Sequence, residues 1–114
     1  MTDRKASPPR LDLLRGTLDL LILRTLLPGP SHGHAVAKHI QRTSEDLLQV
    51  ETGSLYPALY RLELDGAIDA EWGSSENNRR AKYYSLTKRG QKLLGEQQEA
   101  WDRLSSAVHR VLAT

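Results

Sequence analysis

The chain has 114 residues, 39% of them hydrophobic and 26% charged, and carries a formal net charge of +2. Its length is typical of a single domain, and its composition favours a folded chain over a disordered one. The absence of cysteine excludes disulfide scaffolds, thiolate metal sites and thiol nucleophiles. The carboxylates form no pair suited to acid/base catalysis, and no glycine-rich phosphate loop is present. We therefore expect neither an enzyme nor a bound cofactor.

The first residues and the most apolar segment bear on location. The opening segment, MTDRKASPPR, is polar and lacks the apolar region of a secretory signal. Residues 18–27 are about half as long as a membrane span and contain Asp19 and Arg24. These features predict no membrane association, and together with the absence of cysteine they lead us to expect a cytoplasmic protein.

The first predicted helix covers residues 10–27 and follows a disordered basic tail, residues 1–9. Its leucines, Leu14 and Leu18 among them, fall on more than one side of the helix. Pro28 ends it. Because a small domain covers one side of such a helix, the second side predicts contact with another chain.

The second predicted helix covers residues 31–43, with Ser31 as its N-cap. A short connection follows over residues 44–51. We expect Leu47, Leu48 and Val50 to tuck this connection against the core, with Val50 a candidate for brief strand pairing.

The third predicted helix starts near residue 53 and ends at residue 65, where Gly66 provides a left-handed stop. Pro57 is expected in its first turn, where the missing N–H costs little. The helical spacing predicts a buried stripe of Leu55, Ala58, Leu59 and Leu62. The outer face of the N-terminal part is left with Ser54, Tyr56, Pro57, Tyr60 and Arg61.

A β-hairpin is predicted next, with strands over residues 68–73 and 82–86 joined by a polar loop. Trp72 is interpreted as a structural residue, packed where the hairpin meets the domain. Tyr83 and Tyr84 point in opposite directions, so one of them belongs to the core. The segment 77–92 contains six bases and no acid: Arg79, Arg80, Lys82, Lys88, Arg89 and Lys92. This concentration of cations is typical of a surface that meets nucleic acid.

The last predicted helix begins after Thr87, its N-cap, and reaches about residue 113. Its far half repeats apolar residues at helical spacing: Trp101, Leu104, Val108, Val111 and Leu112. No other predicted helix of the chain reaches this stripe, so the pattern predicts a partner chain.

The order of three helices, a hairpin and a long helix predicts a mainly α fold with a small β-hairpin wing. Residues 10–86 are expected to form a winged helix-turn-helix domain, and residues 87–114 a dimerisation helix. In this fold the third helix faces the major groove and the hairpin loop the adjacent backbone. One alternative is a winged-helix scaffold that binds only protein, although such a module has no need of the six bases. Arg61 has an alternative role as an ion-pair partner of Asp65.

Four segments carry a family resemblance: LLRGTLDLLILRTL, GPSHGHAVAKHIQ, GSLYPALYRLELDGAI and AEWGSSENNRRAKYYSLTKRG. Over about residues 11–95 they resemble the PadR-like family of bacterial transcriptional regulators, and they are most similar to the branch often termed acidobacterial PadR-type. The resemblance implies a homodimeric repressor of a palindromic DNA operator, with a short C-terminal dimerisation helix. His34 stands where the family pattern usually has Tyr, and Tyr60 where His or another polar residue is frequent.

The resemblance also implies roles for particular residues. It assigns DNA contacts to Lys38 on the second helix, to Ser54, Tyr56, Pro57, Tyr60 and Arg61 on the third, and to Arg79, Arg80 and Lys82 on the wing. The dimer interface is expected to include Leu14, Leu18, Trp101, Leu104, Val108 and Leu112. The E-x-W-x-R pattern around Trp101 is similar to that of a multidrug-binding family member, which implies a site for a planar aromatic effector between the subunits. The alternative is that Trp101 only fills the dimer interface.

Three histidines, His32, His34 and His39, lie close together in the sequence. Their spacing does not bring all three to one helix face, and no HExxH pattern accompanies them. We therefore predict no metal site.

Overall fold

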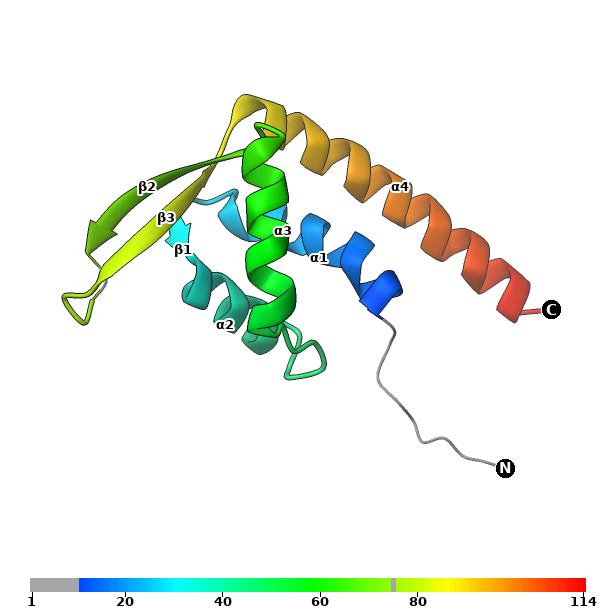
Figure 1. Cartoon of the computed structure of the whole chain (residues 1–114). Helices are drawn as coiled ribbons and strands as arrows, with labels where there is room; N and C mark the ends of the chain where they lie inside the picture. Colours follow the sequence, from blue (N-terminus) through cyan, green and yellow to red (C-terminus); the bar gives the residue numbers. More distant parts are fainter. Residues whose placement is uncertain (1–10, 75) are drawn as a thin grey trace.

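The computed structural model describes residues 11–74 and 76–114, with side chains described from residue 16 onward. The predicted tail, residues 1–9, and the side chain of Leu14 lie outside the described part. The elements are α1 (Leu11–Leu26), β1 (Ser31–His32), α2 (Gly33–Thr43), α3 (Thr52–Leu64), β2 (Ile68–Ser74), β3 (Arg80–Leu86) and α4 (Lys88–Leu112). Figure 1 shows α1, α2 and α3 beside the hairpin, with α4 extending away as a long arm. The predicted fold class is confirmed.

The core forms where α1 packs against the other helices and the base of the hairpin. Ile22, Leu23 and Leu26 of α1 are almost fully buried. The stripe predicted on α3 is confirmed, because its buried residues are Leu55, Ala58, Leu59 and Leu62. Leu18, expected at the dimer interface, is only 7% exposed and belongs to this single-chain core. Its apolar surface is already covered without a partner.

The sheet has three antiparallel strands in the order β1-β3-β2. The small strand β1 places Ser31 opposite Tyr84 and His32 opposite Tyr83. The prediction that Ser31 caps α2 is therefore wrong, because Ser31 is held in the sheet. His32 caps instead: its Nδ1 accepts a hydrogen bond of 3.2 Å from the N–H of Ala35. Val50 pairs with no strand, since β1 takes the edge of β3.

Two predictions between α2 and α3 need correction. Leu47 is 85% exposed, so it does not tuck against the core, whereas Leu48 and Val50 do. Helix α3 begins earlier than expected, and the N–H groups of Ser54 and Leu55 both donate to the carbonyl of Glu51 at 2.9 Å. Pro57 therefore lies inside the helix, beyond its first turn.

The junctions on either side of the hairpin are closed by local hydrogen bonds. Gly66 has a φ of 79°, a left-handed value that suits glycine, and ends α3 as predicted. Thr87 caps α4 as predicted, because its Oγ1 accepts from the N–H of Gly90 at 3.0 Å. The same hydroxyl contacts the carbonyl oxygen of Ala67, at 2.9 Å. The start of β2 and the start of α4 are thus joined, which fixes the base of the hairpin.

Candidate nucleic-acid interface

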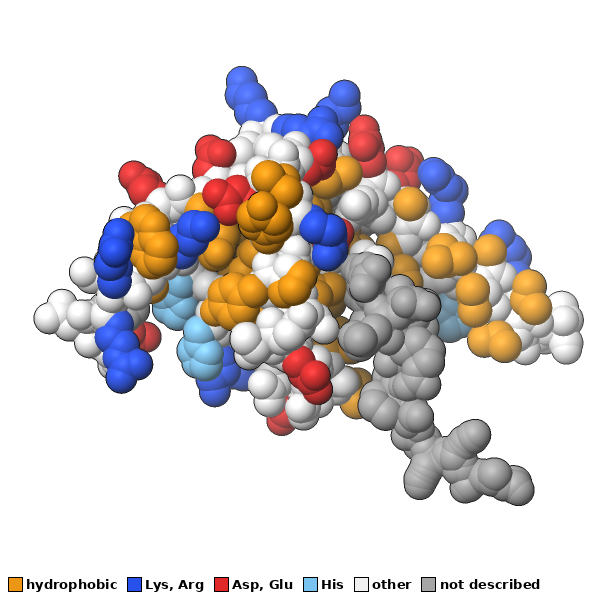
Figure 2. Space-filling model, viewed as in Figure 1, with side chains coloured by type: hydrophobic (Ala, Val, Ile, Leu, Met, Phe, Trp, Pro, Cys, Tyr) orange, Lys and Arg blue, Asp and Glu red, His pale blue; other side chains and the backbone are white. Residues whose placement is uncertain are grey.

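The outer face of α3 presents hydroxyl groups and aromatic rings. Tyr56, Pro57, Tyr60 and Arg61 are exposed and Ser54 is half-buried. Figure 2 shows hydrophobic side chains gathered over the middle of the view, where α3 lies, and Tyr60 is 62% exposed. The sequence-predicted residues of α3 therefore share one accessible surface, while the opposite stripe holds the helix in the core.

Tyr56 also has a structural contact within the chain. A Cβ atom on Gly33 would lie 2.8 Å from the hydroxyl oxygen of Tyr56 and 2.9 Å from its ring. The ring of Tyr56 thus rests against the first residue of α2, where only glycine leaves room for it. This contact sets how closely α3 approaches the start of α2.

Arg61 is paired with a residue on another helix. Its Nη2 lies 2.9 Å from Oδ1 of Asp19 on α1. The alternative pairing with Asp65 is wrong, because Asp65 instead binds Arg89 at 2.9 Å. Packing of α3 across α1 brings Asp19 within reach, a contact that helical spacing alone does not reveal. Part of the charge of Arg61 is therefore already balanced within the chain.

The hairpin, called the wing below, carries exposed cations near its tip. Arg79 and Arg80 are both exposed, whereas Lys82 is half-buried and its Nζ lies 3.6 Å from Oε1 of Glu63 on α3. Within the described residues, neither arginine has a carboxylate at ion-pair distance. The wing thus keeps two cations available at its end and uses the third against α3. Lys38, predicted on α2, is also exposed.

Trp72 is not packed where the hairpin meets the domain, which corrects the interpretation above. Strand β2 continues to Ser74, so Trp72 lies out along the wing, where it is 55% exposed. The guanidinium carbon of Arg80 lies 4.4 Å from the centre of its ring. The indole is thus covered by a cation rather than by the core.

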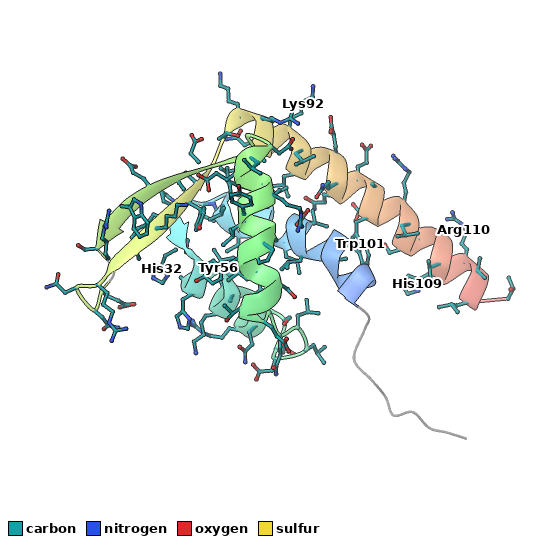
Figure 3. The ribbon with its side chains drawn as sticks, viewed as in Figure 1. His32, Tyr56, Lys92, Trp101, His109 and Arg110 are labelled. Carbon is teal, nitrogen blue, oxygen red and sulfur yellow. The ribbon has the colours of Figure 1, made fainter. Side chains whose placement is uncertain are left out.

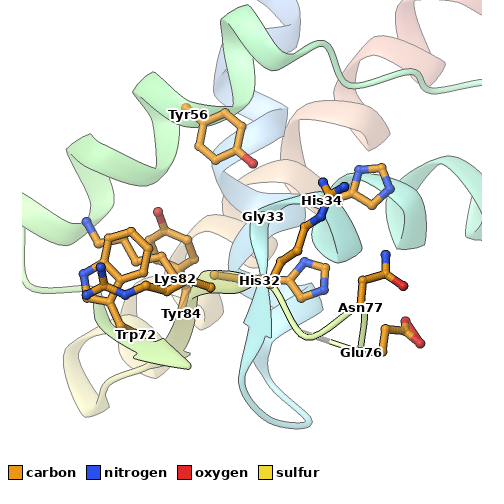
Figure 4. A pocket seen from close by; sticks show the side chains of 12 residues that line it. His32, Gly33, His34, Tyr56, Trp72, Glu76, Asn77, Lys82 and Tyr84 are labelled. Atoms are coloured by element: carbon orange, nitrogen blue, oxygen red, sulfur yellow. The ribbon is translucent and has the colours of Figure 1, made fainter. Parts of the chain in front are cut away.

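A groove of about 590 Å³ lies between the wing, α3 and the start of α2. Figure 4 shows Tyr56 on α3 above Trp72, Lys82 and Tyr84, with His34 and Asn77 across from them. The lining residues are His32, Gly33, His34, Tyr56, Trp72, Glu76, Asn77, Arg79, Arg80, Ala81, Lys82 and Tyr84. The arrangement joins the aromatic face of α3 to the basic wing in one concave surface.

The groove contains a buried tyrosine with a shifted pKa and a pair of stacked histidines. The pKa of Tyr84 is raised above its ordinary value of 10.0, mainly by burial and then by the nearby charges of Glu63 and Tyr56, so its hydroxyl stays neutral. His32 and His34 stack with ring centres 6.4 Å apart. Across the described ranges, no three His, Cys, Asp or Glu side chains lie close enough to hold a metal ion.

The far half of α4 presents the apolar stripe predicted for a partner chain. Trp101 is 41% exposed and Leu104 54% exposed, and Val108, Val111 and Leu112 are also exposed. Figure 3 shows Trp101, His109 and Arg110 on this half, well beyond the wing. The near half is different, because Leu94 is buried in the core. Within the described residues, no helix has the length and hydropathy of a membrane span.

The order of the elements, the buried stripe of α3 and the basic wing define a winged helix-turn-helix protein. Residues 22–96 match the transcriptional regulator PadR-like family. Because this match covers more than half of the chain, the chain belongs to that family. It is a DNA-binding transcriptional regulator rather than an enzyme.

Two solved structures and one sequence relative are similar to this chain over most of its length. A transcriptional regulator from Clostridium thermocellum is 31% identical, with a TM-score of 0.80 over 87% of this chain and 96% of that one. A PadR family transcriptional regulator from Eggerthella lenta is 34% identical, with a TM-score of 0.77 over 91% of this chain and 88% of that one. An uncharacterized protein X of Lysinibacillus sphaericus is 29% identical and covers 87% of this chain, which spans 91% of that protein.

Proposed function

We propose that the protein is a homodimeric repressor that binds a near-palindromic DNA operator. The observation that carries the proposal is the groove shared by α3 and the wing, where Arg79 and Arg80 are exposed without a carboxylate partner among the described residues. Lys and Arg side chains at such a surface neutralise phosphates and release counterions, which provides affinity for any duplex. The chemically varied face of α3 beside them is suited to reading base edges.

The residues of the interface divide by role. Ser54, Tyr56, Pro57 and Tyr60 are proposed to face the major groove. Lys38, Arg79, Arg80 and Lys82 are proposed to contact phosphates, and Arg61 to contribute with the part of its charge that Asp19 leaves unbalanced. In this division residues 10–86 bind DNA and residues 87–114 dimerise. A chromosomal operator in a bacterium implies that the protein acts in the cytoplasm.

A second copy of the chain is the proposed partner of the α4 stripe. Trp101, Leu104, Val108 and Leu112 expose an apolar surface that the described part of the chain leaves uncovered, and Leu14 of α1 is proposed to join it. Two copies related by a two-fold axis would place their α3 helices in successive major grooves, about 34 Å apart. This spacing is the reason to expect a near-palindrome.

A planar hydrophobic ligand between the two copies is the proposed signal for release. Trp101, as a large exposed aromatic in the dimer stripe, would stack on such a ligand. The ligand must bind the released dimer better than the DNA-bound dimer, since otherwise it shifts no equilibrium.

The operator experiment is selection of bound fragments from the native genome at stated salt concentrations, followed by footprinting. We expect protected half-sites related by two-fold symmetry. Protection of an asymmetric site, or equal retention of all fragments, would contradict the proposal.

The dimer experiment compares Leu104→Asp with Leu47→Asp by sedimentation. Both variants place a carboxylate at an exposed leucine, but only Leu104 lies in the α4 stripe. We expect Leu104→Asp to give monomers that bind the operator weakly, and Leu47→Asp to remain dimeric. Two dimeric variants would remove the stripe from the interface.

The ligand experiment follows the emission of Trp101 in a Trp72→Phe background, which leaves it as the single tryptophan. We expect quenching by planar aromatic compounds that also lower operator affinity. Constant emission across a chemically varied panel would reject the ligand site.

A further inference from the structure

Trp72 and Arg80 form a contact on the part of the wing that the core does not cover. The strand register places Trp72 opposite Lys82 and Ser74 opposite Arg80, so both side chains project from the same face of the hairpin. Further along that face lie Ile68 and Tyr84, which are buried in the core. One side of the hairpin therefore packs on the domain near the base of the wing and lines the groove near the tip, and the Trp72–Arg80 pair lies on this side.

The geometry of the pair leaves its hydrogen-bonding groups available. The guanidinium carbon of Arg80 lies over the indole ring, 4.4 Å from the ring centre, which is the distance of a cation–π contact. Its five N–H donors lie in the plane of the guanidinium and point outward along its edges. Contact with the ring thus limits the rotamers of Arg80, and within the described residues its N–H donors make no side-chain hydrogen bond.

The charges around the pair leave Arg80 as an available cation. Lys82, the nearest base on the same face, lies 3.6 Å from Glu63. Arg79 and Glu76 also line the groove, with opposite charges. No carboxylate in the described residues is at ion-pair distance from Arg80, so its charge is not balanced by an ion pair there and can pair with an anion from outside the chain.

We infer that the Trp72–Arg80 pair is a preformed contact for the DNA backbone, in which Arg80 donates to a phosphate and the exposed part of the Trp72 ring packs on the neighbouring deoxyribose. The inference rests on the proposed function and adds Trp72 as a positioning residue that also touches DNA. A sugar-phosphate backbone matches the pair because it offers an apolar ring surface next to each anion. The groove beside the pair is also lined by Tyr56 of α3, so a duplex read by α3 would pass along it.

The test is a double-mutant cycle on the selected operator, with wild type, Trp72→Ala, Arg80→Ala and the double variant titrated at several salt concentrations. We expect Arg80→Ala to lower the salt slope by about 1.8, because the proposed homodimer loses one phosphate contact from each of its two copies. Trp72→Ala should weaken binding about 5-fold and also lower the slope, because an unsupported arginine samples other rotamers. The double variant should lose less than the product of the two single losses.

A second measurement follows Trp72 itself. In a Trp101→Phe background Trp72 is the single tryptophan, and its emission should change at the stoichiometric point of an operator titration. Trp72→Phe should retain much of the affinity that Trp72→Ala loses, because a phenyl ring still stacks on Arg80. Thermal unfolding should be little changed in both variants, since Trp72 is largely exposed.

The controls separate this inference from the proposed function. Lys92→Ala removes one of the six bases clustered in the sequence, but Lys92 lies on α4 and does not line the groove, so affinity and slope should be unchanged. If wild type binds the operator while Trp72→Ala binds equally well, or if the two losses simply multiply, the pair is overturned and the proposed function stands. If wild type shows no preference for any genomic fragment, both are overturned.

Discussion

Helix α3 and the wing border the same groove but offer it different chemistry. The exposed face of α3 carries hydroxyl groups, two tyrosine rings and a proline, and its one arginine is bound to Asp19. The wing tip carries two exposed arginines without a carboxylate partner in the described chain. On the basis of this difference we propose that α3 discriminates between bases and that the wing supplies affinity that is independent of sequence.

The double variant Arg79→Ala/Arg80→Ala should have the largest effect on DNA binding. Loss of two charge-assisted contacts from each copy of the proposed homodimer should weaken binding by more than about 100-fold. The salt slope should fall by about 3.6, because four phosphate contacts are lost per dimer, and the loss should be similar for operator and random duplex. Lys88→Ala/Lys92→Ala is the matched control, because these two bases of the same sequence cluster are exposed on α4 and do not line the groove. An unchanged salt slope in the wing variant would show that Arg79 and Arg80 do not contact phosphates.

Changes on α3 should instead affect discrimination. Ser54→Ala and Tyr56→Ala are each expected to lower the ratio of operator to random-duplex affinity about 10-fold, with little change in salt slope. Tyr56→Phe is the informative companion, since it keeps the ring that rests against Gly33 and removes only the hydroxyl. Competition titrations measure the ratio, and a ratio equal to that of wild type would place these side chains outside the base contacts.

Breaking the Asp19–Arg61 ion pair would add an available cation to α3, which otherwise has none. Asp19→Asn releases Arg61 and removes a negative charge near the duplex, so binding to all sequences should tighten about 3-fold at low salt. Asp65→Asn is the matched control, because it releases Arg89 from a pair of the same length outside the groove. Equal effects of the two variants would show that the position of Arg61 is irrelevant to DNA.

The smallest effect concerns Tyr84 at the base of the wing. Its pKa is raised in the folded chain, chiefly by burial and also by the charges of Glu63 and Tyr56. An unfolded tyrosine ionises near its ordinary value of 10.0, so the folded state binds more protons above that pH and stability falls as the pH rises. Tyr84→Phe should make this fall shallower between pH 9 and about pH 11. Urea titrations of both proteins at these pH values measure it, and parallel curves would contradict the assignment.

Local patterns predicted the elements that depend on local spacing. The apolar residues of α3 at helical intervals identified its buried stripe, and Thr87 and Gly66 marked helix ends through their own side-chain or backbone chemistry. The family resemblance supplied the candidate contacts on α3 and on the wing. The helix predictions and the family resemblance both depend on patterns within short segments of the sequence.

Contacts between distant segments account for the errors. Ser31 has the chemistry of an N-cap, but pairing with Tyr84 in β3 places it in the sheet and leaves the capping position to His32. The partner of Arg61 lies on α1, 42 residues away in the sequence. Trp72 suggested core packing by its residue type, and only the length of β2 shows that it lies beyond the core.

The central position of β3 has a mechanical consequence. One edge of this strand is joined to β2 in the wing, and the other to β1, which leads directly into α2. Bending the wing independently would break the β1 pairing and disturb the histidine that caps α2. The position of the wing is therefore coupled through β1 to the start of α2 on the other side of the groove. In the proposed homodimer, a signal that releases DNA would therefore act on the separation of the two DNA-binding units rather than on the wing alone.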